Sequence, residues 1–235
     1  MKYLIVNADD FGASRGINRG VIDAHQQGIL TSASLLVTAP WAQDAASLGR
    51  AAVELSVGLH ADLKRQDQTD SEGVRNELRE QFIRFQAFIG QPPTHLDSHH
   101  NIHRDPELLP LFLELAQEYK VPLREHSSVH YYSNFYGQWD GQTHLEHISS
   151  ERLEHILQNE IGPGVTELSC HPGYIDPDFL SAYSSEREAE LAALCSPRVR
   201  QVVEEHGIEL ISYQELGKLQ MNPSPGTIVG EASVA

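Results

Sequence analysis

Short apolar segments that alternate with helical patterns constrain the fold of this chain more than any other feature. The expected strands end near residues 6, 37, 59, 97, 123, 169 and 211, and helical patterns lie between and after them. Such alternation is typical of a parallel sheet with helices packed against it. We therefore predict an α/β fold, a single-domain irregular (β/α) barrel of TIM-like type with about seven parallel strands. An open, doubly wound sheet is the alternative.

The chain has 235 residues, and one domain is the simplest division of it. We expect the barrel to cover residues 1–220. Residues 221–235 are rich in Pro, Gly and Ser, which predicts a disordered tail. No Gly-x-Gly-x-x-Gly sequence follows the first strand and no Walker-type loop is present, so a dinucleotide-binding or P-loop fold has no support.

The charge balance argues against two classes of partner. Lys and Arg number 17 against 33 Asp and Glu, giving a formal net charge of -16. Nucleic acids and anionic membranes both require a basic surface, so we expect neither as a partner. The cysteines, Cys170 and Cys195, form no CxxC pair, and the N-terminal apolar run is too short for a signal peptide. We expect a cytoplasmic protein with free thiols.

Histidines gather in one short segment, residues 94–104, at the end of the fourth expected strand. This segment contains Asp97 and four of the chain's thirteen histidines, namely His95, His99, His100 and His103. Imidazole is the commonest protein ligand for transition metals. The segment therefore indicates a metal site, and a His-rich loop without a ligand role is the alternative.

Other chemically active side chains also fall where expected strands end. These are Asp9 and Asp10 after the first strand, His60 after the third, Asp97 and His99 after the fourth, Arg124 after the fifth and His171 after the sixth. In a parallel barrel, the carboxyl ends of all strands lie on one face, where such folds carry their active sites. We therefore expect these side chains to converge.

One carboxylate and two imidazoles form a common ligand set for a catalytic divalent cation, with positions left for water and substrate. Our hypothesis is that Asp10, His60 and His99 are the ligands. Several alternatives stay open at this point. An acid of the Asp9–Asp10 pair can cap the first helix, and His60 can be a buried, hydrogen-bonded histidine. His100 or His103 can replace His99 or serve as an outer group.

Five motifs carry a resemblance to a known family. They lie at residues 7–12, 58–60, 94–100, 135–137 and 170–172, with the sequences NADDFG, GLH, THLDSHH, FYG and CHP. These motifs resemble those of the YdjC-like carbohydrate deacetylases, which include the chitooligosaccharide (chitin disaccharide) deacetylases. The resemblance covers nearly the whole chain. It implies an irregular barrel, often a homodimer, that binds a divalent metal and removes acetyl groups from small N-acetylated sugars.

The resemblance also implies roles for single residues. It makes Asp10, His60 and His99 metal ligands, Asp9 the general base and His171 the general acid. It suggests Mg²⁺, whereas two imidazole ligands suit Zn²⁺ or Mn²⁺ better by ligand type. Two departures from the family pattern lie on the substrate side: the connection after His60 is short and polar, and Asn101 stands where a third consecutive histidine is usual.

Four further residues are expected to take part in substrate binding: Asp97, His103, Arg124 and Tyr136. Asp97 can instead orient a ligand histidine. Arg124 can orient Asp9, hold a substrate anion or form a surface ion pair. Tyr136 belongs to an aromatic loop, residues 131–139, that offers ring faces to sugars or else forms a small separate core.

The predicted function is metal-dependent removal of an N-acetyl group from an N-acetylglucosamine-containing saccharide, such as diacetylchitobiose or its phosphate. One alternative is a metal-dependent hydrolase of another bond, a phosphoester or a cyclic amide. A second alternative is a sugar-binding barrel without catalytic activity.

Overall fold

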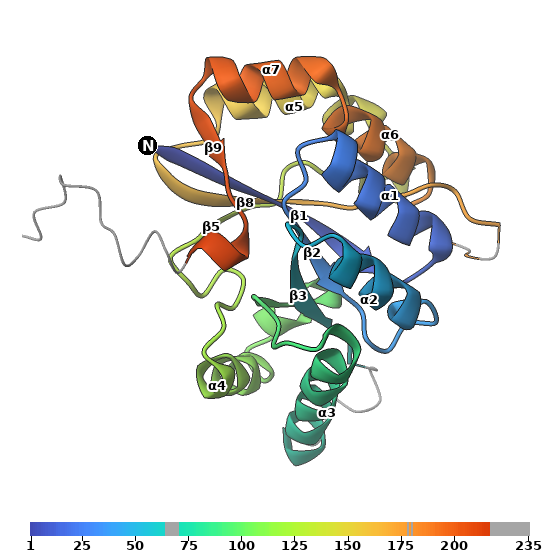
Figure 1. Ribbon diagram of the computed structural model, residues 1–235, viewed down its shortest axis with the longest axis vertical. Helices are drawn as coiled ribbons and strands as arrows, with labels where there is room; N and C mark the ends of the chain where they lie inside the picture. Colours follow the sequence, from blue (N-terminus) through green and yellow to red (C-terminus); the bar gives the residue numbers. More distant parts are fainter. Residues whose placement is uncertain (64–70, 178, 180, 217–235) are drawn as a thin grey trace, which may run out of the picture.

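The computed structural model of the protein describes residues 1–63, 71–177, 179 and 181–216 (Figure 1). Its centre is a seven-stranded parallel sheet with helices packed around it. The strands of this sheet are β1 (Lys2–Phe11), β2 (Ser32–Leu35), β3 (Ser56–Ala61), β4 (Leu96–Ser98), β5 (His130–Tyr132), β8 (Gly164–Cys170) and β9 (Ile208–Leu210). The predicted α/β class with a parallel sheet is confirmed.

Helices connect most of these strands. They are α1 (Arg15–Gln27), α2 (Ala42–Ala51), α3 (Ser71–Ile89), α4 (Leu109–Tyr119), α5 (Ser150–Asn159), α6 (Ser185–Leu194) and α7 (Pro197–Glu205), with 3₁₀ turns η2 (His99–Arg104) and η3 (Leu145–Ile148). Helices α5 and α7 pack together near one end of the sheet, and α3 and α4 pack together near the other (Figure 1). Residues 217–235 lie outside the described part, and with them the whole of the expected tail, residues 221–235.

The strand order corrects the prediction of a closed barrel. The order is β4-β3-β2-β1-β8-β5, with β9 paired to the amino-terminal half of β1. In the described part of the chain, no strand pairing joins β4 to β5, so the sheet is not closed by a continuous ladder. The number of strands agrees with the prediction, but the TIM-like closure does not.

The open edge has a local cause at the fifth expected strand. Residues 121–123 make only an isolated parallel bridge, in which Leu123 pairs with Leu96 of β4. Pro122 has no N–H to extend the ladder, and Glu125 turns the chain with a φ of 63°. The strand that joins the sheet is instead β5, which pairs with β8 inside a segment predicted to be an irregular loop. This segment also contains a small hairpin of β6 (Gln138–Trp139) and β7 (Gln142–Thr143).

The central strands are buried along their length, as expected of parallel strands that are covered on both faces. In β1 all residues from Leu4 to Phe11 are buried, and both Asp9 and Asp10 belong to this buried stretch. In β3 all six residues are buried, including His60. Polar side chains of the candidate site are therefore fixed by strands inside the core, where side-chain freedom is small.

Both Cys170 and Cys195 are free thiols, as predicted. None of the helices in the described residues combines the length and apolarity that crossing a membrane requires.

Helix α1 packs very closely against the segment that follows His171. An ideal Cβ built on Gly20 would lie 2.5 Å from the Cα of Gly173, and one built on Gly16 would lie 2.4 Å from the carbonyl oxygen of Tyr174. Tyr174 N donates to Gly16 O at 3.1 Å. Because α1 follows β1 directly, this contact fixes the segment after His171 relative to the strand that carries Asp9 and Asp10.

Replacing Gly20 with Ala tests this contact. The new Cβ would meet backbone atoms, so either α1 or the loop must move. We expect the free energy of unfolding to fall by about 1–3 kcal/mol, as for other overpacked sites, despite the better helix propensity of Ala. Urea denaturation followed by circular dichroism measures the change.

Gly49→Ala in α2 is the matched control. Its Cβ would meet the Cγ2 of Val57 at 3.3 Å, and a side-chain methyl can shift where a backbone atom cannot. We expect its free energy of unfolding to stay within about 1 kcal/mol of the parent value, because Ala is the better helix former. Equal losses in the two variants would contradict the proposed backbone contact.

Candidate active site

The strands direct their carboxyl ends toward one cavity with a volume of about 800 Å³. Its walls include Asp9, Asp10, His60, His99 and His171, together with Tyr136 and Arg187. The predicted convergence of residues from distant parts of the sequence is therefore observed. A cavity of this size accommodates a small sugar.

Asp10, His60 and His99 bring one ligand atom each into a cluster within 4.8 Å. Asp10 Oδ1 is 3.1 Å from His99 Nδ1 and 3.5 Å from His60 Nε2. The same oxygen is buried and accepts no hydrogen bond from the described residues. A buried carboxylate oxygen without a hydrogen bond is costly, and a cation held by these three atoms would satisfy it. The residues therefore fit a divalent metal.

An irregularity in β1 aims the two adjacent carboxylates in different directions. The pairing register between β1 and β2 shifts between Ala8 and Phe11, and Asp10 has a φ of 65°. Bulges of this kind often redirect side chains next to active sites. The helix-cap alternative for these acids is wrong, because α1 is capped by Ser14, whose hydroxyl accepts a hydrogen bond from Ile17 N.

The imidazole of His60 is oriented by a buried carboxylate. His60 Nδ1 lies 2.7 Å from Asp97 Oδ1, which leaves Nε2 directed at Asp10. Burial alone would lower the pKa of His60, but the charges of Asp97 and Asp9 raise it to about 10. The surroundings therefore favour a positive charge at this ring, and either a proton or a bound cation can supply it. A carboxylate behind a histidine is a common arrangement in metal sites.

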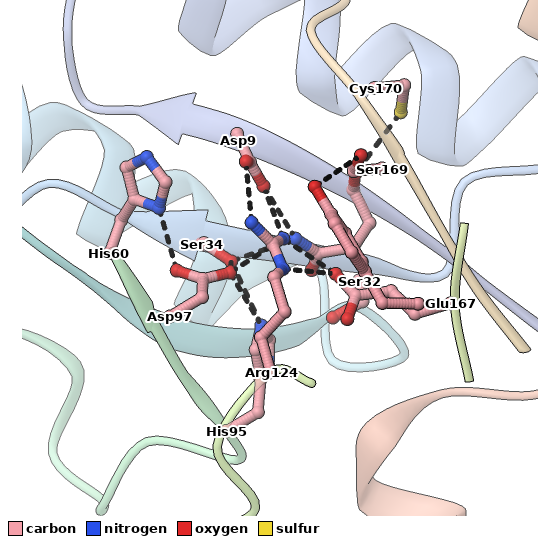
Figure 2. A network of polar contacts seen from close by, with 12 residues as sticks. Asp9, Ser32, Ser34, His60, His95, Asp97, Arg124, Glu167, Ser169 and Cys170 are labelled. Carbon is pink, nitrogen blue, oxygen red and sulfur yellow. Dashed lines mark hydrogen bonds and ion pairs between the residues drawn. The ribbon is translucent and has the colours of Figure 1, made fainter. Parts of the chain in front are cut away.

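Arg124 lies buried at the centre of a charged network (Figure 2). Its guanidinium donates to Asp9 Oδ2 at 2.9 Å and to Asp9 Oδ1 at 2.7 Å. It also donates to Glu167 Oε1 at 2.6 Å and is 2.8 Å from Asp97 Oδ2. The surface ion pair considered for Arg124 is therefore wrong, and the arrangement favours orientation of Asp9.

Asp9 lines the cavity, and hydrogen bonds from buried residues fix the orientation of its carboxylate. Besides Arg124, Asn7 donates to Asp9 Oδ1 at 2.9 Å. Burial would raise the pKa of Asp9, but the charge of Arg124 lowers it below its ordinary value. Asp9 therefore stays ionised at neutral pH. A second potential ligand group, Asp9 with His60 and Asp97, is also compact, but Arg124 forms ion pairs with both of its carboxylates.

Three residues expected to bind substrate lie behind the cavity wall. Asp97, His103 and Arg124 are buried, and none of them belongs to the described residues that line the cavity. His103 Nδ1 is 2.6 Å from the hydroxyl of Ser98, so its ring points away from the ligand cluster. The geometry favours a supporting role for these three residues, and it favours His99 over His103 as a ligand. Tyr136 does line the cavity and is 39% exposed.

His171 also lines the cavity, where it lies beside the buried carboxylate of Glu190. Its Nδ1 is 3.8 Å from Glu190 Oε1, and its backbone N donates to Glu190 Oε2. The Tyr183 hydroxyl donates to the same carboxylate. Burial would lower the pKa of His171, but Glu190, together with Asp9 and Asp10, raises it. A raised pKa favours the protonated ring that a general acid requires.

The sequence analysis missed the contribution of helix α6. Arg187 and Glu190 both lie on its buried face, where Arg187 contacts Asp10 and Glu190 contacts His171. A signal was present, because Arg187 and Glu190 share 3.6-residue spacing with the buried Leu191 and Leu194. Charged residues in such an apolar stripe indicate buried ion pairs. Glu167 on β8 was also missed, although it lies between Thr166 and Leu168 in a continuous run of buried residues.

Comparison with known proteins identifies the family. The family described as YdjC-like protein matches residues 3–71 and 63–205. The chain belongs to the YdjC-like family. A carbohydrate deacetylase from Geobacillus stearothermophilus is 36% identical over 93% of this chain and 99% of its own length. A chitooligosaccharide deacetylase from Serratia marcescens is 33% identical over 92% of this chain and 99% of its own length.

A solved structure shows the same fold. It belongs to a protein from Enterococcus faecalis V583 that is described as a suggested cellobiose-phosphate cleavage protein. The two chains are 30% identical, and the match covers 92% of this chain and 98% of the other with a TM-score of 0.79. The arrangement of strands and helices in this YdjC-like protein is therefore shared with an experimentally determined structure.

Removal of single ligands tests the metal site. Asp10→Ala and His60→Ala each delete one member of the three-atom cluster. We expect both variants to lose most of the divalent metal that the parent protein binds, because affinity depends on the full ligand set. Metal content after dialysis, measured by mass spectrometry, gives the result. His155→Ala, at an exposed ring on α5, is the control. Undiminished metal in both ligand variants would exclude this cluster.

Proposed function

We propose that this YdjC-like protein is a metal-dependent deacetylase that removes the N-acetyl group from an N-acetylglucosamine-containing saccharide, such as diacetylchitobiose or its phosphate. One observation carries the proposal: the three-atom cluster of Asp10, His60 and His99 shares a cavity with Asp9 and His171. The deacetylase activities of curated relatives at 33–36% identity support it.

Hydrolysis of an amide needs an activated water, compensation for negative charge on the carbonyl oxygen, and a proton for the leaving amine. A divalent cation, when bound by Asp10, His60 and His99, polarises the carbonyl and lowers the pKa of a water molecule toward about 7. Asp9 is the proposed general base. It is ionised and held by two hydrogen bonds from Arg124, which fix its direction but also weaken its basicity.

His171 is the proposed general acid, which delivers a proton to the sugar amine as the C–N bond breaks. Its raised pKa keeps a useful fraction of the ring protonated at neutral pH. Tyr136 and Tyr183 stack with ring centroids 4.9 Å apart, and the Tyr136 ring centroid is 5.7 Å from that of His171. We propose that the exposed part of Tyr136 contacts the sugar ring near the acid.

The finer features of the function are also proposals. Mg²⁺ is proposed from the family resemblance, with Zn²⁺ or Mn²⁺ as alternatives because two of the three ligands are imidazoles. A homodimer is proposed on the same ground, and a cytoplasmic location is proposed because Cys170 and Cys195 are free thiols, as in a reducing compartment.

The competing interpretations predict different behaviour. A hydrolase of phosphoesters or cyclic amides would use the same cation but release no acetate. A sugar-binding protein without activity would need neither a base nor an acid beside the ligand cluster. Asp9 and His171 both line the cavity, which favours an enzyme.

Acetate release from a panel of N-acetylated sugars tests the proposed reaction. The panel should contain N-acetylglucosamine, diacetylchitobiose, triacetylchitotriose and diacetylchitobiose phosphate. We expect release from at least one of them to require added divalent metal and to fall by about 100-fold or more in Asp9→Asn, which keeps the metal but lacks the base. Turnover by Asp9→Asn near the parent rate would show that Asp9 is not the base.

The pH dependence tests the role of His171. Glu190→Gln removes a negative charge beside the ring, so the pKa of His171 should fall toward its ordinary value. Because a general acid must be protonated, activity is lost as the pH rises through its pKa, and a lower pKa moves this alkaline limb to lower pH. We expect the limb of kcat/KM to shift downward, whereas Glu188→Gln on the same helix should leave it in place. An unshifted limb in Glu190→Gln would count against His171 as the acid.

A further inference from the structure

Arg187 is a buried cation that the mechanism above does not use. It lies in the first turn of α6 and is only 6% exposed. Its guanidinium also lines the cavity that contains the ligand cluster. A buried guanidinium is retained only where its partners compensate for lost hydration, so its contacts indicate what it does.

The two oxygens of Asp10 have different partners. Oδ1 faces the imidazoles, 3.1 Å from His99 Nδ1 and 3.5 Å from His60 Nε2. Oδ2 accepts a hydrogen bond from Arg187 Nη2 at 2.5 Å. Arg187 is therefore placed on the oxygen that does not face the imidazole ligands. A carboxylate binds a metal through one oxygen or both, and an arginine on one oxygen biases that choice.

We propose that Arg187 is a positioning residue that restricts Asp10 to a single coordinating oxygen and so keeps a further coordination position open for water and substrate. A cation shared by both oxygens of Asp10 would have to approach the guanidinium, and like charges repel strongly where water is excluded. The open position is what separates a catalytic site from a closed structural one. The effect of Arg187 on turnover rests on the proposed function, whereas its effect on how Asp10 coordinates a metal does not.

A second contact of Arg187 supports this role. Its Nη1 donates to the carbonyl oxygen of His171 at 3.4 Å, so one side chain contacts both a ligand and the backbone of the proposed acid. The segment after His171 also lies close to this side chain, because a Cβ added to Gly173 would be 3.3 Å from Arg187 Cδ. The hydrogen bond to the backbone of His171 limits the freedom of the guanidinium to withdraw from Asp10. The Nε atom has no hydrogen-bond partner among the described residues, so Asp10 Oδ2 is the main acceptor for this group.

Arg187→Met tests the proposal, because Met removes the charge and the donors and keeps much of the volume. Mn²⁺ is the probe, and two quantities are measured without any sugar present. Titration gives the Kd, and the paramagnetic relaxation of water protons reports how much water exchanges at the ion. We expect a Kd no weaker than that of the parent protein and a lower relaxation enhancement, since Asp10 is then free to use both oxygens. Acetate release, where the parent shows it, should fall about 10- to 100-fold.

Two further variants make the result specific. Arg187→Lys keeps a cation that can donate to Oδ2, and we expect it to restore most of the relaxation enhancement. Arg198→Met removes an arginine from α7 whose side chain is 47% exposed, and it should match the parent protein. If Arg187→Met does not fold, Arg187→Lys still tests the proposal. A relaxation enhancement in Arg187→Lys that differs clearly from that of the parent protein would then oppose it.

The outcomes separate this inference from the proposed function. Unchanged relaxation in Arg187→Met, or a clear loss of Mn²⁺ affinity, would overturn the role assigned to Arg187. If the parent protein binds no divalent metal, both proposals fail at the metal site. If the Mn²⁺ results are as expected and no sugar in the panel releases acetate, the deacetylase proposal fails while the role of Arg187 stands.

Discussion

The buried guanidinium of Arg124 is the contact on which the candidate site depends. It forms ion pairs with carboxylates from three different strands or strand ends, Asp9, Asp97 and Glu167 (Figure 2). Each of these acids would be costly to bury alone, and an arginine shared among them makes their burial possible. Tyr213 donates to the other oxygen of Glu167 at 2.6 Å and completes the far side of the network. The network therefore links β1, β4 and β8 beneath the cavity before any ligand binds.

The charges around this network explain why a cation fits at the cavity floor. Burial would raise the pKa values of Asp9, Asp10 and Asp97, but hydrogen bonds and nearby positive charges lower them, so all three are negative at neutral pH. Arg124 and Arg187 supply two positive charges against these three carboxylates, and Glu167 is a further acid paired with Arg124, so negative groups outnumber the arginines here. Burial would lower the pKa of His60, but the negative charges of Asp97 and Asp9 raise it, since a proton on the ring offsets that excess. A divalent cation at the same ring would supply more positive charge and would displace that proton.

The sequence predicted the parts of the site that come from strand ends, and the reason is geometric. Parallel strands present their carboxyl ends on one side, so Asp10, His60, His99 and His171 could be placed together from their positions at strand ends. Sheet closure could not be predicted, because it depends on a short segment with Pro122 and on the turn at Glu125. The burial of Arg124 and His103 could not be predicted either, since a position at a strand end does not show whether the side chain points into the cavity or behind its wall. Arg187 was missed because it reaches the site from a helix.

Helix α6 gives the site a property that the strand ends alone would not have. Arg187 and Glu190 are three residues apart on its buried face, so the helix holds their relative positions. Arg187 contacts Asp10, and Glu190 contacts His171. A displacement of α6 would disturb the ligand carboxylate and the imidazole together. The close packing of α1 against the segment after His171 opposes such a displacement. Helix packing therefore sets the distance between the carboxylate of Asp10 and the imidazole of His171. The sheet carries both residues at the ends of its strands.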